Sequence, residues 1–291
     1  MGEGPPDTIG PGVFTETVPK LKELGYRTAL ITGAGSGLGQ AFARALLEEG
    51  LTVWGTSRRE DGMSEEPGLI PARLELGDAE SIDRLCDRIE RDTDGIDLLI
   101  ANAGYGVFGP FGSHAFEDWE KQVETMLTGT MRLVHRTMAA MGDRQPTAIV
   151  LVTSLAVEFP IPFLCGYNAV KAGLAGFAGG LMVESGGVGP TIIDFRPGDY
   201  RTSFNRSMGL TATDPSNSDR AQRVSRRLDA VMAASPDPHR AARDLIRALQ
   251  RNRHQVVRSG SFFQARLAPT LSRLLPESWL RAAARSYFRI N

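Results

Sequence analysis

Short apolar segments alternate with segments of helical periodicity along most of this chain. The expected strands are residues 27–32, 51–56, 70–75, 96–101, 147–153 and 191–195. The expected helices lie between them: residues 38–49, a helix capped by Asp78, residues 115–141 and residues 167–185. Strands that are apolar on both faces and alternate with helices are typical of a doubly wound parallel sheet. The sequence therefore predicts an α/β fold whose ligands bind outside the carboxyl ends of the strands.

The composition argues against several other classes of protein. Hydrophobic residues make up 42% of the 291 residues, so the chain can bury a large core. A formal net charge of −1 argues against nucleic-acid binding. Two cysteines exclude a disulfide scaffold, and four scattered histidines give no ligand spacing, so no metal site is expected. We expect a cytoplasmic protein, because no apolar run approaches a membrane span and the first residues lack a signal-peptide pattern.

The chain divides into a tail, one domain and an extension. Residues 1–26 are rich in Gly and Pro at their start and are expected to form an N-terminal tail, with a short helix over 13–25. The domain is expected to span 27–260. Within it, residues 204–237 are polar and poor in aromatic side chains, which predicts a flexible lid over the substrate.

Residues 261–291 form a basic amphipathic extension. The chain from residue 220 onward contains 15 arginines, no lysine and four acidic residues. The interpretation we favour is that the extension packs on the domain or on another subunit. The alternatives are binding to an anionic partner or attachment to a membrane surface.

A glycine-rich turn joins the first expected strand to the first expected helix. Residues 32–39 read Thr-Gly-Ala-Gly-Ser-Gly-Leu-Gly. Glycine lets the backbone come close to a phosphate, and the N–H groups at the start of a helix attract it. In this strand–turn–helix context the turn predicts a dinucleotide site. Its predicted residues are Gly33, Ser36, Gly37, Leu38 and Gly39.

Two arginines at the end of the second strand indicate which dinucleotide binds. An acidic residue there would bond the adenosine ribose and repel a 2′-phosphate. This chain instead has Ser57, Arg58 and Arg59 before the first acid, Glu60. Guanidinium groups match a phosphate by their planar fork. The sequence therefore favours NADP(H) over NAD(H), with one of the two arginines expected to face solvent.

A possible acid–base group lies in the second half of the domain. Ser154 ends the fifth strand, and Tyr167 and Lys171 are four residues apart, on one face of a helix. A free tyrosine has a pKa near 10, and we expect the nearby ammonium to lower it. Tyrosine could then exchange a proton with a carbonyl or alcohol oxygen. The chain has only four lysines against 29 arginines, so a lysine at this position is notable.

Together these motifs resemble the classical short-chain dehydrogenases/reductases, over about residues 28–202. The motifs are Thr32-Gly33-x3-Gly37-x-Gly39, Asn102-Ala103-Gly104, Ser154, Tyr167-x3-Lys171 and Pro197-Gly198. The resemblance implies a Rossmann-type single domain, an enzyme, and a homo-oligomer. It also implies that Gly33, Gly37 and Gly39 cradle the cofactor phosphates and that Asn102, Ala103 and Gly104 line the cofactor side of the cleft.

The resemblance also implies roles for the later residues. Ser154 would hydrogen-bond the substrate oxygen, Tyr167 would be the general acid or base, and Lys171 would bind the nicotinamide ribose. Thr202, shortly after Pro197 and Gly198, would contact the nicotinamide amide. The apolar segment 155–163 is expected either to line the cleft or to fill the core beneath it.

One departure from the family pattern leaves two functions open. Met126 stands where many members have an asparagine that passes protons to the lysine, and methionine has no hydrogen-bond donor. The leading hypothesis is an NADP(H)-dependent oxidoreductase that interconverts a carbonyl and an alcohol on an apolar small molecule. The alternative is a dinucleotide-binding regulatory or scaffold protein with little turnover.

Overall fold

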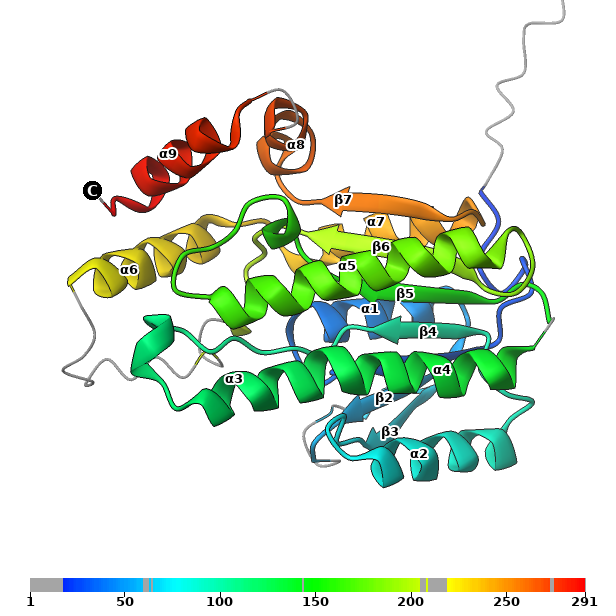
Figure 1. Cartoon of the computed structure of the whole chain (residues 1–291). Coiled ribbons are helices and arrows are strands. Elements are labelled where there is room, and N and C mark those ends of the chain that lie inside the picture. The colour runs from blue at the N-terminus through cyan, green and yellow to red at the C-terminus, as the bar shows by residue number, and fades with distance from the viewer. Residues whose placement is uncertain are drawn as a thin grey trace, which may run out of the picture.

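The computed structural model describes residues 18–59, 63, 65–142, 144–204, 208, 219–272 and 275–290. In this part of the chain seven strands form one parallel sheet in the order β3-β2-β1-β4-β5-β6-β7 (Figure 1). The strands are β1 Thr28–Thr32, β2 Thr52–Ser57, β3 Leu69–Arg73, β4 Leu98–Ala101, β5 Ala148–Val152, β6 Thr191–Pro197 and β7 Gln255–Ser259. The predicted doubly wound, Rossmann-type sheet is confirmed.

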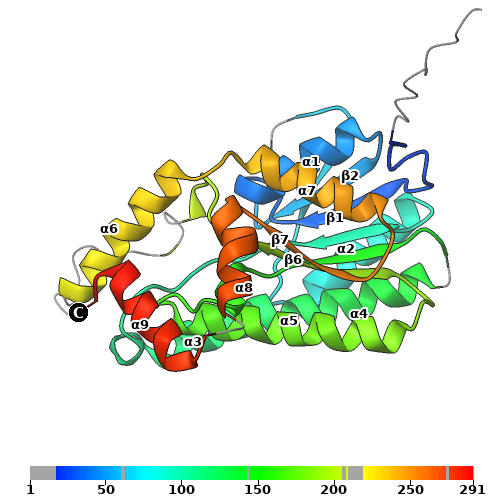
Figure 2. The same ribbon diagram turned by 90° about the horizontal axis from the view of Figure 1, so that it is seen from above.

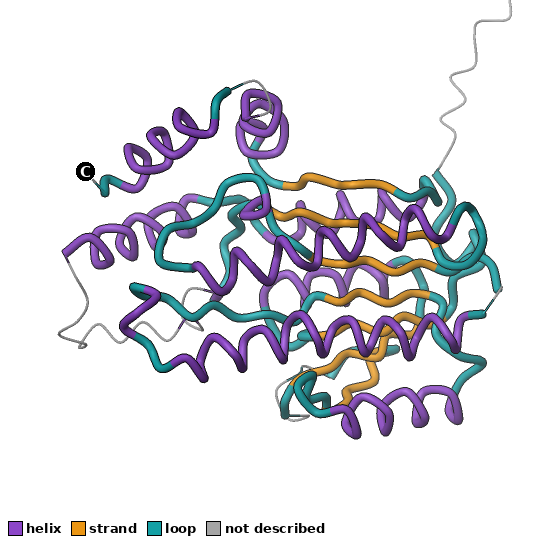
Figure 3. Tube along the Cα trace, viewed as in Figure 1, coloured by secondary structure: helices purple, strands orange, loops and turns teal. Residues whose placement is uncertain are grey.

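Helices cover both faces of the sheet, as Figures 1 and 3 show. They are α1 Gly37–Glu48, α2 Ala79–Asp92, α3 Phe116–Val123, α4 Gly129–Met141, α5 Cys165–Ser185, α6 Asp219–Ala234, α7 Pro238–Gln250, α8 Ala268–Ser272 and α9 Glu277–Phe288. Asp78 caps α2 as expected, because its side chain accepts a hydrogen bond from Glu80 N. Among the described residues, no helix combines the length and hydropathy needed to cross a membrane.

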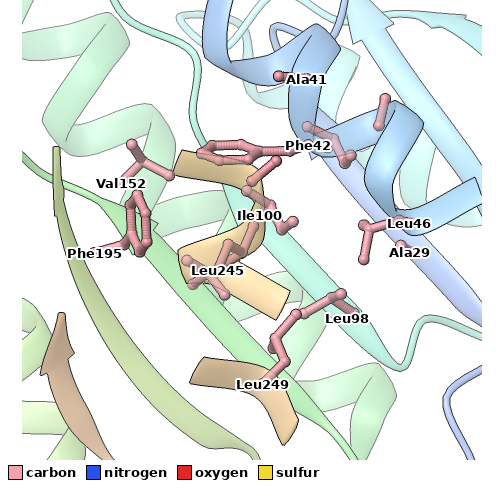
Figure 4. Packing of buried hydrophobic residues seen from close by; sticks show 14 of the residues in the cluster. Ala29, Ala41, Phe42, Leu46, Leu98, Ile100, Val152, Phe195, Leu245 and Leu249 are labelled. Atoms are coloured by element: carbon pink, nitrogen blue, oxygen red, sulfur yellow. The ribbon is translucent and has the colours of Figure 1, made fainter. Parts of the chain in front are cut away.

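Alternate residues of the strands fill two separate cores. Ile100 and Phe195 face α1 and α7, whereas their neighbours along the strands, such as Leu99, face α2, α4 and α5. In the first core, the rings of Phe42 and Phe195 meet edge to face with centroids 5.7 Å apart (Figure 4). Strands buried on both faces explain the continuous apolar runs in the sequence.

The segment predicted as one helix over 115–141 is divided in the structure. A π-helical turn, Glu124–Thr128, separates α3 from α4. At the start of α4, a Cβ atom on Gly129 would lie 2.0 Å from the carbonyl oxygen of Leu76. The helix therefore packs against the segment that follows β3 more closely than any side chain at this position would allow.

Several predictions near the ends of the chain were wrong or incomplete. Residues 21–25 form a hydrogen-bonded turn rather than a helix, and residues 1–17 lie outside the described residues. The proposed flexible lid, 204–237, contains the regular helix α6; its residues 205–207 and 209–218 lie outside the described residues. The strand β7 and the helix α7 were not predicted, because charged residues interrupt their apolar pattern.

The C-terminal segment 261–290 packs on the domain, as favoured from the sequence. It contains a π-helical turn, Phe263–Leu267, followed by α8 and α9. Helix α9 lies beside α6 (Figure 2), and Phe288 is buried in a cluster that also contains Leu228 and Tyr167. The basic extension thus reaches the region where the predicted acid–base residues lie.

Candidate active site

A cavity of about 2040 Å³ opens at the carboxyl ends of the strands, where the sheet topology predicts ligands. Most of the predicted site residues line it. These are Gly33, Ser36, Gly37, Leu38, Arg58, Asn102, Ala103, Gly104, Ser154, Tyr167, Lys171, Pro197, Gly198 and Thr202. Gly39 and Arg59 do not line it. No cluster of His, Cys, Asp or Glu that could hold a metal ion occurs among the described residues.

The glycine turn has the backbone geometry of a phosphate cradle. Gly33 and Gly37 have φ angles of +71° and +57°, which glycine adopts without strain. The side chain of Ser36 makes no capping hydrogen bond, so it does not occupy the N–H groups that open α1. Thr202 lies across the turn from Gly37. These groups fit the pyrophosphate of a dinucleotide.

Gly39 has a packing role, which differs from the expected phosphate contact. A Cβ atom at this position would lie 2.1 Å from the carbonyl oxygen of Gly33 and 2.6 Å from Nδ2 of Asn102. The amide of Asn102 in turn donates to the carbonyl oxygen of Thr32 over 2.9 Å. Helix α1 can therefore approach the first turn only because residue 39 has no side chain.

The structure brings Ser154, Tyr167 and Lys171 together on one wall of the cavity. The phenol of Tyr167 is hydrogen-bonded to the side chain of Ser154. The ammonium of Lys171 lies 5.7 Å from the centroid of the Tyr167 ring and donates to the carbonyl oxygen of Val152 over 2.7 Å. All three side chains are buried. The three side chains thus lie together, as predicted from the helical spacing of Tyr167 and Lys171 and from the position of Ser154 after β5.

The expected lowering of the Tyr167 pKa is not found. Burial raises this pKa to about 12; the hydrogen bond from Ser154 opposes the rise, and the nearby carboxylate of Asp199 adds to it. Burial also lowers the pKa of Lys171 to about 8, against the stabilising charge of Asp194. For the pKa of Tyr167, desolvation therefore outweighs the effect that was expected from the nearby ammonium of Lys171. At neutral pH the site holds a protonated phenol beside an ammonium.

Two residues near this wall, Asp199 and Gln264, were not predicted as site residues from the sequence. Asp199 lines the cavity, and its carboxylate accepts a hydrogen bond from the Gln264 side chain. Burial raises the pKa of Asp199. Its position directly after Pro197 and Gly198 is the sequence feature that could have indicated a place in the site. Gln264 comes from the C-terminal segment, and nothing in the local sequence places it there.

Met126 is buried near Gly104 and Lys171. Its side chain is only 1% exposed, and its sulfur accepts a hydrogen bond from the backbone N–H of Tyr105 over 3.3 Å. A Cβ atom on Gly104 would lie 3.0 Å from Met126 Cε and 3.7 Å from Lys171 Nζ. Met126 therefore occupies space close to the ammonium without offering it a polar partner.

The substrate side of the cavity has an apolar wall. Most of the segment 155–163 lines it, including Leu155, Phe159 and Ile161. The carboxylate of Glu158 accepts from Arg196 and Arg258 over 2.8 and 2.7 Å, and these bonds fasten the segment to β6 and β7. The C-terminal segment closes the opposite side with residues such as Leu280, Ala284 and Phe288.

Comparison with known proteins agrees with this architecture. A sequence model of the family described as short chain dehydrogenase matches residues 27–212. The chain belongs to the short-chain dehydrogenase/reductase family. It is thus an oxidoreductase with a nucleotide-binding Rossmann-type fold.

Individual members of the short-chain dehydrogenase/reductase family show how far the similarity extends. Serine 3-dehydrogenase of Agrobacterium fabrum is 31% identical over 61% of this chain and 73% of its own length. A short chain dehydrogenase from Burkholderia cenocepacia, solved in complex with NADP, is 22% identical, with a TM-score of 0.69 over 90% of this chain and 98% of its own. A Burkholderia phymatum member, solved with NAD, is 19% identical, with a TM-score of 0.75 over 87% and 93%.

Proposed function

We propose that this protein interconverts a carbonyl and an alcohol on an apolar small molecule with NADP(H). The observation that carries the proposal is the convergence of Ser154, Tyr167 and Lys171 on the wall of a cavity that the glycine turn also lines. The bound nicotinamide would supply or accept the hydride. Gly33, Ser36 and Gly37 would hold its pyrophosphate, and Asn102, Ala103 and Gly104 its ribose side.

Proton transfer is assigned to Tyr167. In carbonyl reduction the phenol donates its proton to the substrate oxygen, and Ser154 donates a hydrogen bond to the same oxygen. The ammonium of Lys171, held by the carbonyl oxygen of Val152, stabilises the phenolate that forms. Because all three groups are buried, their mutual electrostatic effects are stronger than in water.

Reduction is expected to slow as the pH rises through about 8. The pKa of Lys171 is about 8, so only about a tenth of the molecules keep the ammonium at pH 9, and kcat/KM should fall about tenfold from pH 7 to 9. Unfolding does not explain this loss. The pKa in the folded state lies below the ordinary 10.5, so this group makes the fold more stable as the pH rises from 8 to 10.5.

A pH profile of kcat/KM for an accepted ketone tests this expectation. The Lys171→Arg variant keeps its charge at every pH used, so its profile should be flat in this range although its rate is lower. A flat profile for the wild-type protein up to pH 9.5 would mean that the charge of Lys171 is not needed.

The preference for NADP(H) rests on Arg58. Arg58 lines the cavity directly after β2, where the 2′-phosphate is expected, whereas Arg59 does not line it. Solved relatives are described with NADP or with NAD, so the fold alone does not decide. With an accepted ketone, the Arg58→Gln variant should raise the KM of NADPH about tenfold and leave that of NADH unchanged. Arg59→Gln is the matched control and should change neither value appreciably.

Consumption of NADPH over a panel of apolar ketones tests the function as a whole. Turnover is expected on several members of the panel. Met126 supports a second candidate, a dinucleotide-binding protein with little turnover, because a buried thioether without a hydrogen-bond donor lies near the ammonium, where the family pattern has an asparagine. NADPH binding without turnover on any ketone or alcohol would favour this second candidate.

A further inference from the structure

The wall that α6 gives to the cavity contains one charged side chain among apolar ones. Among the described residues of α6, Arg227 lines the cavity together with Leu228, Ala230, Val231, Met232 and Ala234. Other arginines of this helix, such as Arg226, do not line it. An arginine among the apolar residues of such a wall indicates a specific polar contact with the molecule that fills the cavity.

The surroundings of Arg227 hold its guanidinium in place but leave part of it unsatisfied. The guanidinium carbon lies 4.8 Å from the centroid of the Tyr287 ring. The guanidinium is also hydrogen-bonded to the phenol of Tyr287. Its Nε atom is buried and has no hydrogen-bond partner among the described residues. A buried donor of a charged group left unpaired costs about 1–3 kcal/mol or more. Such a group calls for an acceptor that the described part of the chain does not provide.

The neighbouring charges on the substrate side are already neutralised or hydrogen-bonded. Glu158 bonds two arginines, and Glu277 pairs with Arg281 over 2.9 Å. Asp199 accepts from the neutral amide of Gln264. Across the cavity, α3 contributes Asp118 and Lys121, and Glu124 follows in the π-helical turn, which together add no excess of positive charge. Within the described residues, no carboxylate forms an ion pair with Arg227. Among the described residues, the positive charge of Arg227, which lines the cavity, therefore has no counter-ion.

We propose that Arg227 binds a carboxylate of the substrate, and that the preferred substrate is an apolar ketone or alcohol that also carries a carboxylate. This inference rests on the proposed function, because it describes the same cavity. The guanidinium fork is shaped to take both oxygens of a carboxylate, and Tyr287 fixes its plane. The apolar residues of α6 and of segment 155–163 would enclose the rest of the molecule.

Binding of a non-reacting ligand tests the site without requiring turnover. The full-length protein saturated with NADP⁺ is titrated calorimetrically with octanoate and with its neutral analogue octanamide. The wild-type protein should bind octanoate at least tenfold more tightly, and Arg227→Gln should abolish the difference. Arg227→Lys keeps the charge and should keep part of the preference. Arg226→Gln, one residue away and exposed, is the matched control and should keep all of it.

Equal binding of the two ligands by the wild-type protein, or a preference that survives in Arg227→Gln, would overturn the inference. Reduction of 7-oxooctanoate and 7-oxooctanamide with NADPH separates this failure from failure of the proposed function. Equal kcat/KM for the two ketones contradicts the carboxylate site and leaves the function standing. A clear preference for octanoate without reduction of either ketone leaves the site standing and contradicts the function.

Discussion

Replacing Tyr167 by phenylalanine is expected to lower kcat for ketone reduction by about 10²–10⁴, the usual contribution of a general acid. The variant loses only the phenol oxygen. Its ring keeps its place against Phe204, whose ring centroid lies 5.6 Å away, and its position in the buried cluster. Without the phenol the general acid is lost, whereas the ring contacts and the hydrogen bond from Lys171 to the carbonyl oxygen of Val152 remain. The fold and the binding of NADPH should therefore persist.

Stopped-flow or steady-state NADPH oxidation measures this loss, and fluorescence titration of NADPH confirms that the cofactor still binds. Tyr105→Phe is the matched control, because Tyr105 also lines the cavity and its phenol is hydrogen-bonded to the side chain of Thr125. It should retain most of the activity. Undiminished turnover by Tyr167→Phe would remove Tyr167 from the mechanism.

The central part of the fold follows from local sequence patterns. Strands such as β5 are apolar on both faces, and the glycine turn joins β1 to α1 without insertions, so their type and order could be predicted. The cluster of Ser154, Tyr167 and Lys171 could be predicted because two of its members share a helical face and the third ends a neighbouring strand. In these cases short-range spacing determines the geometry.

The remaining features depend on contacts between distant parts of the chain. The pKa of Tyr167 is governed by burial in a cluster that includes residues of α6 and α9, which local spacing does not reveal. Gln264 reaches Asp199 across 65 residues, and Arg227 meets Tyr287 across 60. The helix α7 carries charged residues between its apolar ones and packs on α1, and β7 pairs with the sheet edge that β6 provides. Tertiary packing decides these elements.

Gly39→Ala is expected to disrupt the cofactor turn and to destabilise the protein by at least about 3 kcal/mol. The added Cβ atom would lie 2.1 Å from the backbone oxygen of Gly33, which no rotamer change can relieve. Either α1 or the turn must shift, and both carry groups proposed to bind the pyrophosphate. A fall in Tm of roughly 6–10 °C and a rise of at least tenfold in the Kd of NADPH should follow.

A helical glycine with free space around it gives the matched control for this substitution. At Gly176, in the middle of α5, an added Cβ atom would meet nothing within 4 Å. Gly176→Ala should therefore raise stability by about 0.5–1 kcal/mol, because alanine is the better helix former, and leave the Kd of NADPH unchanged. Differential scanning calorimetry and NADPH titration of both variants make the comparison. If Gly39→Ala matched Gly176→Ala in both quantities, the close approach of α1 to Gly33 would not be what shapes the turn.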